Sequence, residues 1–214
     1  IAASRLVDDE GQRTLIAAAA AANVEHFVFT SILGASLDHP VDFWRTKARI
    51  EAVVRACGMP YTILQPSAFM EVHAYELIGK HVQLGKRVPV FGPGNNPRNF
   101  VAASDVAEVA HRALVDARFV GQSVPVGGPQ NLTSREVATV FSRVYGTPAT
   151  MLHVPLAVVR GMAALIAPMH EGVGRILRAA IVSETTDQTF DRTSSPLLAG
   201  LRSTALDAWA RAAR

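Results

Sequence analysis

A lysine within the apolar stripe of a helix is the residue of this chain best placed to do chemistry. In the helix expected over residues 42–57, Phe43, Lys47, Ile50 and Val54 fall on one face. Burying an unpaired ammonium is costly. Such a lysine therefore either extends its head to water along the core or points it into a cleft, where it could hold a polar ligand. The helical pattern by itself favours the first arrangement and leaves the second open.

Two short apolar runs flank this helix and must position it. The first covers residues 26–29 and ends in Thr30-Ser31, and the second covers residues 61–64 and stops at Pro66. Because both runs are nearly continuous rather than alternating, they predict strands of a parallel sheet that is buried on both faces. In such sheets ligands bind at the carboxyl ends of the strands. We therefore expect binding residues at Thr30-Ser31 and at residues 66–69.

The motif Phe43-x-x-x-Lys47 lies where short-chain dehydrogenase/reductases carry Tyr-x-x-x-Lys, and it follows a strand that ends near a serine, Ser31. From about residue 10 to residue 190 the chain resembles the NmrA-like, atypical branch of that superfamily. Four segments in the same order carry the resemblance: AAAAANVEHFVFTSILGA, FWRTKARIEAVVRACGMPYTILQPSAFM, FGPGNNPRNFVAASDVAEVAHRAL and NLTSREVATVFSRVYG.

The resemblance implies an α/β fold, namely the C-terminal part of a Rossmann-type doubly wound parallel sheet with a small, mainly helical C-terminal substrate region. It also implies a nicotinamide cofactor. NADP(H) is favoured over NAD(H), although the residues that distinguish the two normally lie in the missing half. Ser31 and Lys47 are the implied catalytic residues, with Lys47 holding the nicotinamide ribose. The implied cofactor contacts are Thr30, Ser31, Lys47, Pro66, Ser67, Ala68 and Phe69.

Two departures from the family pattern matter. Phe43 occupies the tyrosine position, so the usual proton donor to a substrate carbonyl is absent. The glycine-rich phosphate loop of the first strand–helix turn is also missing, and there is no room for the first strands before residue 26. By resemblance the chain starts about halfway through a Rossmann domain, and we expect its sheet to have an exposed edge.

Three further side chains are candidates for the substrate side. His73 and Tyr75 follow on a helix expected over residues 67–78, with Ser67 as its N-cap. Either side chain could donate a proton in place of the missing tyrosine, although ordinary surface or core positions fit the same pattern. Arg98 is the charge of the breaker-rich loop 84–100 that could meet an anionic substrate group.

The domain organisation is expected to be a partial NAD(P)-binding Rossmann-like region over residues 1–146, followed by a substrate or cap region over residues 147–214. Loop 84–100 would contribute to the substrate side. Two apolar helices, over residues 155–167 and 171–183, would cover a substrate pocket or pair two subunits in a homodimer. The family resemblance favours the pocket.

Composition excludes several classes of protein. Of the 214 residues, 49% are hydrophobic and 18% are charged, which excludes a disordered chain. The net charge is only +3 and the basic residues are dispersed, so we expect no nucleic-acid partner. The histidines are scattered and Cys57 is the single cysteine, so no metal site is predicted. The apolar helices are too short for a membrane span, and the location expected is cytoplasmic.

Two functions remain open. The first is an atypical short-chain reductase that passes hydride from NAD(P)H to a small carbonyl or quinone, with Ser31 orienting the substrate oxygen. The second is a non-catalytic NADP-binding regulatory or assembly protein, which the NmrA-like branch also contains and which Phe43 favours. We prefer the enzyme, because Ser31 and Lys47 and the apolar C-terminal cover fit it better. That preference rests on family analogy.

Overall fold

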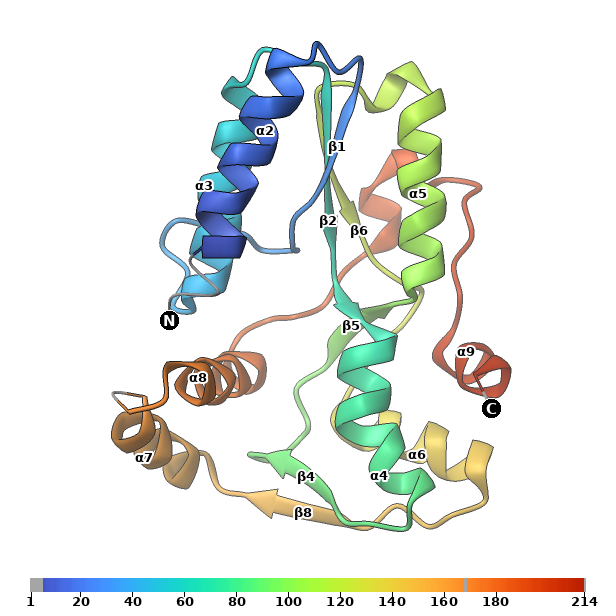
Figure 1. The fold of residues 1–214 in the computed structure, drawn as a ribbon. Helices are drawn as coiled ribbons and strands as arrows, with labels where there is room; N and C mark the ends of the chain where they lie inside the picture. The colour runs from blue at the N-terminus through green and yellow to red at the C-terminus, as the bar shows by residue number, and fades with distance from the viewer. Residues whose placement is uncertain (1–5, 168, 214) are drawn as a thin grey trace.

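Three short strands form a parallel sheet in the order β1-β2-β6 (Figure 1). The computed structural model describes residues 6–167 and 169–213, so the outermost residues of both predicted regions lie outside the described chain. The strands are β1 (Phe27–Thr30), β2 (Tyr61–Pro66) and β6 (Gln122–Val126). Among the described strands, β1 lies at one edge of this sheet.

Helices cover both faces of this sheet (Figure 1). The π-helix η1 (Leu6–Gly11) leads into α2 (Gln12–Ala21), which lies beside α3 (Asp42–Ala56) on one face. The other face carries α5 (Ala103–Val115). Neighbouring residues of β2 alternate between the two cores: Ile63 packs with residues of α2 and α3, and Leu64 packs with residues of α5. This arrangement confirms the predicted α/β, doubly wound fold class.

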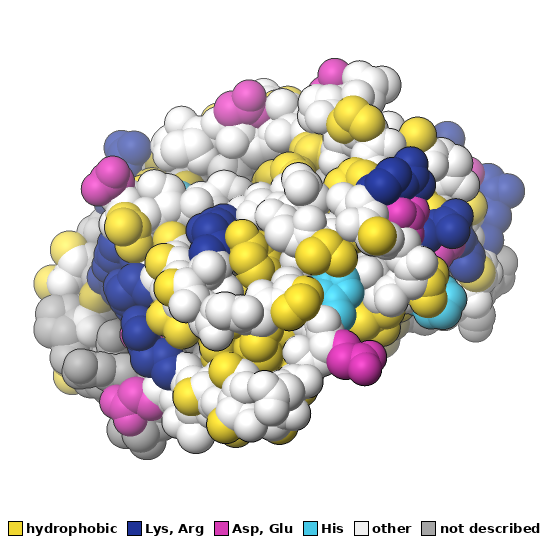
Figure 2. Space-filling model, turned by 90° about the horizontal axis from the view of Figure 1, so that it is seen from above, with side chains coloured by type: hydrophobic (Ala, Val, Ile, Leu, Met, Phe, Trp, Pro, Cys, Tyr) yellow, Lys and Arg dark blue, Asp and Glu magenta, His cyan; other side chains and the backbone are white. Residues whose placement is uncertain are grey.

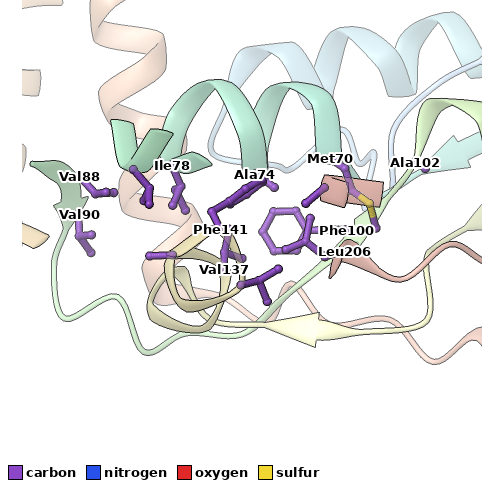
Figure 3. Close-up of a cluster of buried hydrophobic side chains, with 14 residues drawn as sticks. Met70, Ala74, Ile78, Val88, Val90, Phe100, Ala102, Val137, Phe141 and Leu206 are labelled. Carbon is purple, nitrogen blue, oxygen red and sulfur yellow. The ribbon is translucent and has the colours of Figure 1, made fainter. Parts of the chain in front are cut away.

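A second group of elements packs around the phenyl ring of Phe141 (Figure 3). Phe141 lies on α6 (Ser134–Tyr145), against the π-helix η2 (Met70–Gly79). A Cβ on Gly79 would lie 2.7 Å from Cζ of Phe141, so only glycine lets the two helices approach this closely. The remaining elements between β2 and α7 are β3 (Ala68–Phe69), α4 (Lys80–Gln83), β4 (Val88–Phe91), β5 (Arg98–Val101), η3 (Ala117–Phe119), β7 (Asn131–Leu132) and β8 (Met151–Val154).

The C-terminal part is mainly helical, as predicted. The parallel pair β4–β8 leads to α7 (Leu156–Ile166) and α8 (Glu171–Thr185), which pack on each other through Val159, Ala163 and Leu177. Their outer faces stay open, with Leu165 76% and Ile176 65% exposed. The predictions that this pair covers a pocket or joins two subunits, and that a domain boundary lies at residue 146, remain predictions. The chain ends with η4 (Arg192–Ser194), η5 (Pro196–Leu198) and α9 (Leu206–Ala212).

One face of the molecule shows how its charged residues are distributed. Figure 2 views the molecule from the end at which the strands of the sheet begin. Lys and Arg side chains lie there in separate groups, with hydrophobic and uncharged atoms between them. No helix within residues 6–167 and 169–213 is both long and apolar enough to cross a membrane.

A buried carboxamide, that of Asn99 on β5, connects the sheet to the second group of elements. Its Oδ1 accepts hydrogen bonds from the Ser67 hydroxyl (2.8 Å) and from the backbone N–H of Gly128 (2.9 Å). Its Nδ2 lies 3.2 Å from the carbonyl oxygens of Gly128 and Gln130 and 3.0 Å from Oδ1 of Asn131. A Cβ on Gly128 would lie 2.0 Å from the carbonyl oxygen of Phe100, so the strands also meet too closely for any side chain there.

The prediction that Ser67 caps a helix is wrong. The helix begins later, as η2, and its N-cap position is Phe69, which carries no capping side-chain hydrogen bond. Between them, β3 pairs with β5, and Ser67 donates its hydroxyl to Asn99 instead. The sequence pattern missed this because the partner lies 32 positions away.

Asn99→Asp should destabilise the fold by roughly 3 kcal/mol, because it replaces the donating nitrogen by an oxygen that faces three acceptors. Urea unfolding at neutral pH measures this loss. The matched control is Asn95→Asp, in the exposed part of the loop before β5, which should change the stability by less than about 0.5 kcal/mol. Equal stabilities of the two variants would contradict the role given to Asn99.

Candidate functional site

The Lys47 ammonium lies at the carboxyl end of β1. Its Nζ donates to the carbonyl oxygen of Thr30 at 3.1 Å. It also lies 5.0 Å from the ring centroid of Phe29 and 5.7 Å from that of Phe43, within the range of cation–π attraction. The head of Lys47 therefore lies against the end of the strand. That it holds a polar ligand there remains a prediction.

Burial lowers the pKa of Lys47 below its usual value, because desolvation disfavours the charged form. The negative charges of Asp8 on η1 and Glu51 on α3 act in the opposite direction. A half-buried lysine with a lowered pKa at the end of a strand is a frequent feature of functional sites.

The ends of β1 and β2 meet beside this lysine. The Ser31 N–H donates to the carbonyl of Leu64 at 2.7 Å, and the Leu33 N–H donates to that of Pro66 at 2.9 Å. The parallel pairing therefore continues past the strand bounds and brings Thr30-Ser31 next to the segment after Pro66. This is the edge of the sheet at which the sequence placed the site.

The Ser31 hydroxyl is buried and turned toward α3. It donates to Oε1 of Glu51 at 2.5 Å, and Gln65 donates to the same oxygen at 2.9 Å. Sequence reasoning missed Glu51, although one signal was present: the acid lies four positions after Lys47 on the same helical face as Ile50 and Val54.

The segment after β2 runs from this cluster to a second one. Pro66 and Ser67 are buried, and the Ser67 hydroxyl is engaged with Asn99. Ala68 and Phe69 are half-buried in β3 and lead directly into η2. Among the four cofactor contacts predicted in this segment, Ala68 and Phe69 therefore have the more exposed side chains.

His73 and Arg98 form the second cluster. Desolvation lowers the pKa of His73, a hydrogen bond with the backbone of Phe69 opposes this shift, and the positive charge of Arg98 adds to it. Arg98 is bound at Nη2 to the Ser134 hydroxyl at 3.2 Å and to Oε1 of Glu184 on α8 at 3.5 Å. Nε of Arg98 is buried without a hydrogen-bond partner among the described residues. Glu184 and Ser134 were not predicted, because nothing local in the sequence relates them to Arg98.

Tyr75 is placed differently from His73. Its ring lies 6.2 Å from the ring centroids of both Phe141 and Trp209, at the margin of the second core. Its hydroxyl donates to Gln83 at 2.8 Å. These contacts account for Tyr75 through packing.

The residues that could hold the nicotinamide end of a dinucleotide are those around Lys47 and Ser31. Lys47 could donate to ribose hydroxyls, and the meeting ends of β1 and β2 place backbone and small side chains beside it. The chain has no glycine-rich turn that could hold the pyrophosphate. Within the part of the chain that the structure describes, no three His, Cys, Asp or Glu side chains gather as metal ligands would.

Comparison with known proteins supports this fold. The chain is 33% identical to an NAD(P)H azoreductase of Xenophilus azovorans over 154 residues. This match covers 71% of the chain and 52% of the azoreductase. The chain is 32% identical over 160 residues to the photosystem II assembly factor Ycf39 of Synechocystis sp., covering 74% of this chain and 48% of that protein. The fold is similar to that of the NADPH-dependent quinone oxidoreductase QOR2 of Escherichia coli, complexed with NADPH, with a TM-score of 0.74 and 19% identity over 94% of this chain and 70% of that one.

The chain spans about half the length of these two curated relatives. The match to the NmrA-like family itself runs over residues 6–198, nearly the whole chain. It includes the strand–helix–strand unit with Lys47 and the cluster of His73 and Arg98. The chain belongs to the NmrA-like family.

Proposed function

We propose that this chain forms the nicotinamide side of an NAD(P)H-dependent reductase that acts on a small carbonyl or quinone. The observation that carries the proposal is the Lys47 ammonium, held on the Thr30 carbonyl where the ends of β1 and β2 meet. The azoreductase and reductase names of its relatives support the same chemistry. Reduced nicotinamide would supply the hydride, and NADP(H) is preferred over NAD(H).

In this proposal Lys47 binds the nicotinamide ribose, and Thr30, Ser31, Pro66, Ser67, Ala68 and Phe69 line the nicotinamide pocket. Ser31 is the second catalytic candidate, and its hydroxyl is engaged with Glu51. His73 and Arg98 provide the polar part of the substrate side. Tyr75 contributes to the shape of that side only through the core.

A quinone is the acceptor that fits Phe43 best. The phenyl ring lies beside Lys47 at the position of the family's tyrosine and has no proton to give. Reduction of a quinone yields an oxyanion more stable than an alkoxide, so solvent can deliver its proton. A ketone or aldehyde would need a positioned acid.

A non-catalytic NADP-binding assembly or regulatory protein is the second candidate. Two observations favour it: Phe43 leaves the site without the usual proton donor, and assembly factors of photosystem II are among the relatives. Such a protein would keep Lys47 for binding and have no need of the tyrosine.

Calorimetric titration with NADPH and NADH tests the proposal. The curated relatives are about twice as long, so the titration is run on this chain and on a form extended upstream of Ile1. Binding of NADPH by either form, followed by turnover of a small p-quinone, supports the reductase. Binding without turnover supports the assembly protein. If neither form binds either cofactor, the role of Lys47 and the reductase are both wrong.

Lys47→Met should weaken NADPH binding by about 10- to 100-fold, because a charge-assisted hydrogen bond is lost. Calorimetry measures the change. Lys80→Met is the matched control, since Lys80 is exposed and pairs with Glu76 on the surface. An equal loss of affinity in both variants would contradict the assignment.

NADPH affinity should fall with rising pH, with a midpoint below the ordinary lysine value of 10.5, because burial lowers the pKa of Lys47. The sign follows from the charge: above its pKa the neutral amine offers no charge-assisted bond. Affinities measured from pH 7 upward test this. Lys47→Arg should bind with little pH dependence over the same range, since arginine stays protonated. If both proteins lose NADPH affinity equally at high pH, a group other than Lys47 causes the pH dependence.

Phe43→Tyr should raise turnover of a small ketone or aldehyde by about 10- to 100-fold and leave quinone turnover nearly unchanged, because it adds a proton donor beside Lys47. Steady-state assays with both acceptors give the ratio. If cofactor binds and neither acceptor is turned over by either protein, the assembly function is favoured.

A further inference from the structure

Glu51 is a buried acid at the centre of the site that none of the proposed roles uses. It lies on α3 with only 3% of its surface exposed. A buried carboxylate is costly unless hydrogen-bond donors surround it. Its position between α3 and the sheet therefore calls for a physical explanation.

Donors from three parts of the chain surround this carboxylate. Oε1 accepts from the Ser31 hydroxyl (2.5 Å) and from Nε2 of Gln65 (2.9 Å). Oε2 accepts from Arg55 at 2.7 Å. Each of these neighbours is a hydrogen-bond donor, and a carboxylate oxygen can accept from more than one of them. Ser31 follows β1 and Gln65 lies in β2, so one side chain ties α3 to the ends of both strands.

The second bond between α3 and β1 is made by Lys47, one helical turn earlier. Lys47 binds the carbonyl of Thr30, and Glu51 binds the hydroxyl of Ser31, the next residue. The two residues lie about 6 Å apart along the helix axis, at 1.5 Å per residue. A slide or rotation of α3 on the sheet would therefore break both. The aromatic rings of Phe29 and Phe43 offer the ammonium no directional bond of their own.

We propose that Glu51 is a positioning residue of this site: its carboxylate anchors α3 to the ends of β1 and β2 and thereby holds the Lys47 ammonium over Thr30. The inference rests on the proposed function only for its consequence, that cofactor affinity depends on Glu51. The anchoring itself is a property of the chain without ligand.

The electrostatics agree with this geometry. The charged groups that act on Lys47 are Asp8 from η1 and Glu51 from its own helix, both of which favour the ammonium against the cost of burial. The strands contribute the neutral carbonyl of Thr30 and the Phe29 ring. Removing the Glu51 charge should therefore also make Lys47 easier to deprotonate.

NMR of the lysine side chains tests the anchoring without cofactor. The sequence has three lysines, Lys47, Lys80 and Lys86, so ¹³C-lysine labelling gives three ε-methylene signals, and Lys47→Arg assigns the first. In the native chain the Lys47 signal should be displaced by the ring currents of Phe29 and Phe43 and should titrate at lower pH than that of Lys80.

Glu51→Gln should reduce that ring-current displacement and move the Lys47 midpoint to still lower pH, because the charge and its bond to Arg55 are lost. The matched control is Glu76→Gln, which removes an equally spaced acid, 49% exposed at its side chain, from Lys80. That variant should move the Lys80 signal and leave Lys47 unchanged. A folded Glu51→Gln protein with an unaltered Lys47 signal would overturn the proposal.

If Glu51→Gln does not fold, Glu51→Asp replaces it. The shorter side chain keeps the charge but cannot reach both Ser31 and Gln65, so the ring-current displacement should still fall. An unaltered Lys47 signal in this variant overturns the proposal equally.

The link to the proposed function is tested separately. NADPH should bind the folded Glu51 variant about tenfold more weakly than the native protein, by calorimetry. If the native protein binds no cofactor, the proposed function fails, and the lysine signals still decide whether Glu51 positions Lys47. If the variant binds NADPH as tightly as the native protein although its Lys47 signal has changed, Glu51 positions Lys47 without affecting cofactor binding.

Discussion

The carboxamide of Asn99 is the interaction on which the arrangement of this molecule depends. It joins the end of β2, through Ser67, to the turn after β6, through Gly128, and it does so from β5 of the second group of elements. Both of its polar atoms are paired inside the protein, and a buried, fully paired amide makes its surroundings more rigid. The position of His73 and Arg98 relative to the sheet follows from this junction.

Lys47 shows how the site balances burial against pairing. An ammonium between two aromatic rings loses much of its hydration, and the Thr30 carbonyl and nearby carboxylates replace part of it. The result is a cation that is held in place and is easier to deprotonate than a surface lysine. Such a group can donate hydrogen bonds to a polar ligand at the end of the strand.

Phe43 determines which steps of a reductase reaction this site could support. With a phenyl ring at the tyrosine position, binding and hydride transfer remain possible while proton donation does not. Relatives with reductase names and relatives with assembly names are both compatible with such a site. The network of Glu51, Ser31 and Gln65 is needed in either case, because it places Lys47 before any chemistry begins.

The sequence by itself determined the local elements. Near-continuous apolar runs predicted β1 and β2, and helical spacing predicted α3. The capping box of Thr133 and Glu136 at the start of α6 is equally local, because its two residues lie three positions apart. Asn23 and Gly146 have positive φ angles, a conformation that asparagine and glycine adopt more readily than other residues. These features depend on neighbours within a few positions, so a single sequence contains the information.

Only the tertiary structure decided which polar side chains meet. The Ser67 hydroxyl bonds to Asn99 rather than capping a helix, and the Ser31 hydroxyl bonds to Glu51. Arg98 pairs with Glu184 on α8. In these pairs the partners lie 20 to 86 positions apart. A buried donor or acceptor must find a partner, but its residue type does not say which, because several orientations satisfy the same local pattern. The packing of strands and helices makes that choice.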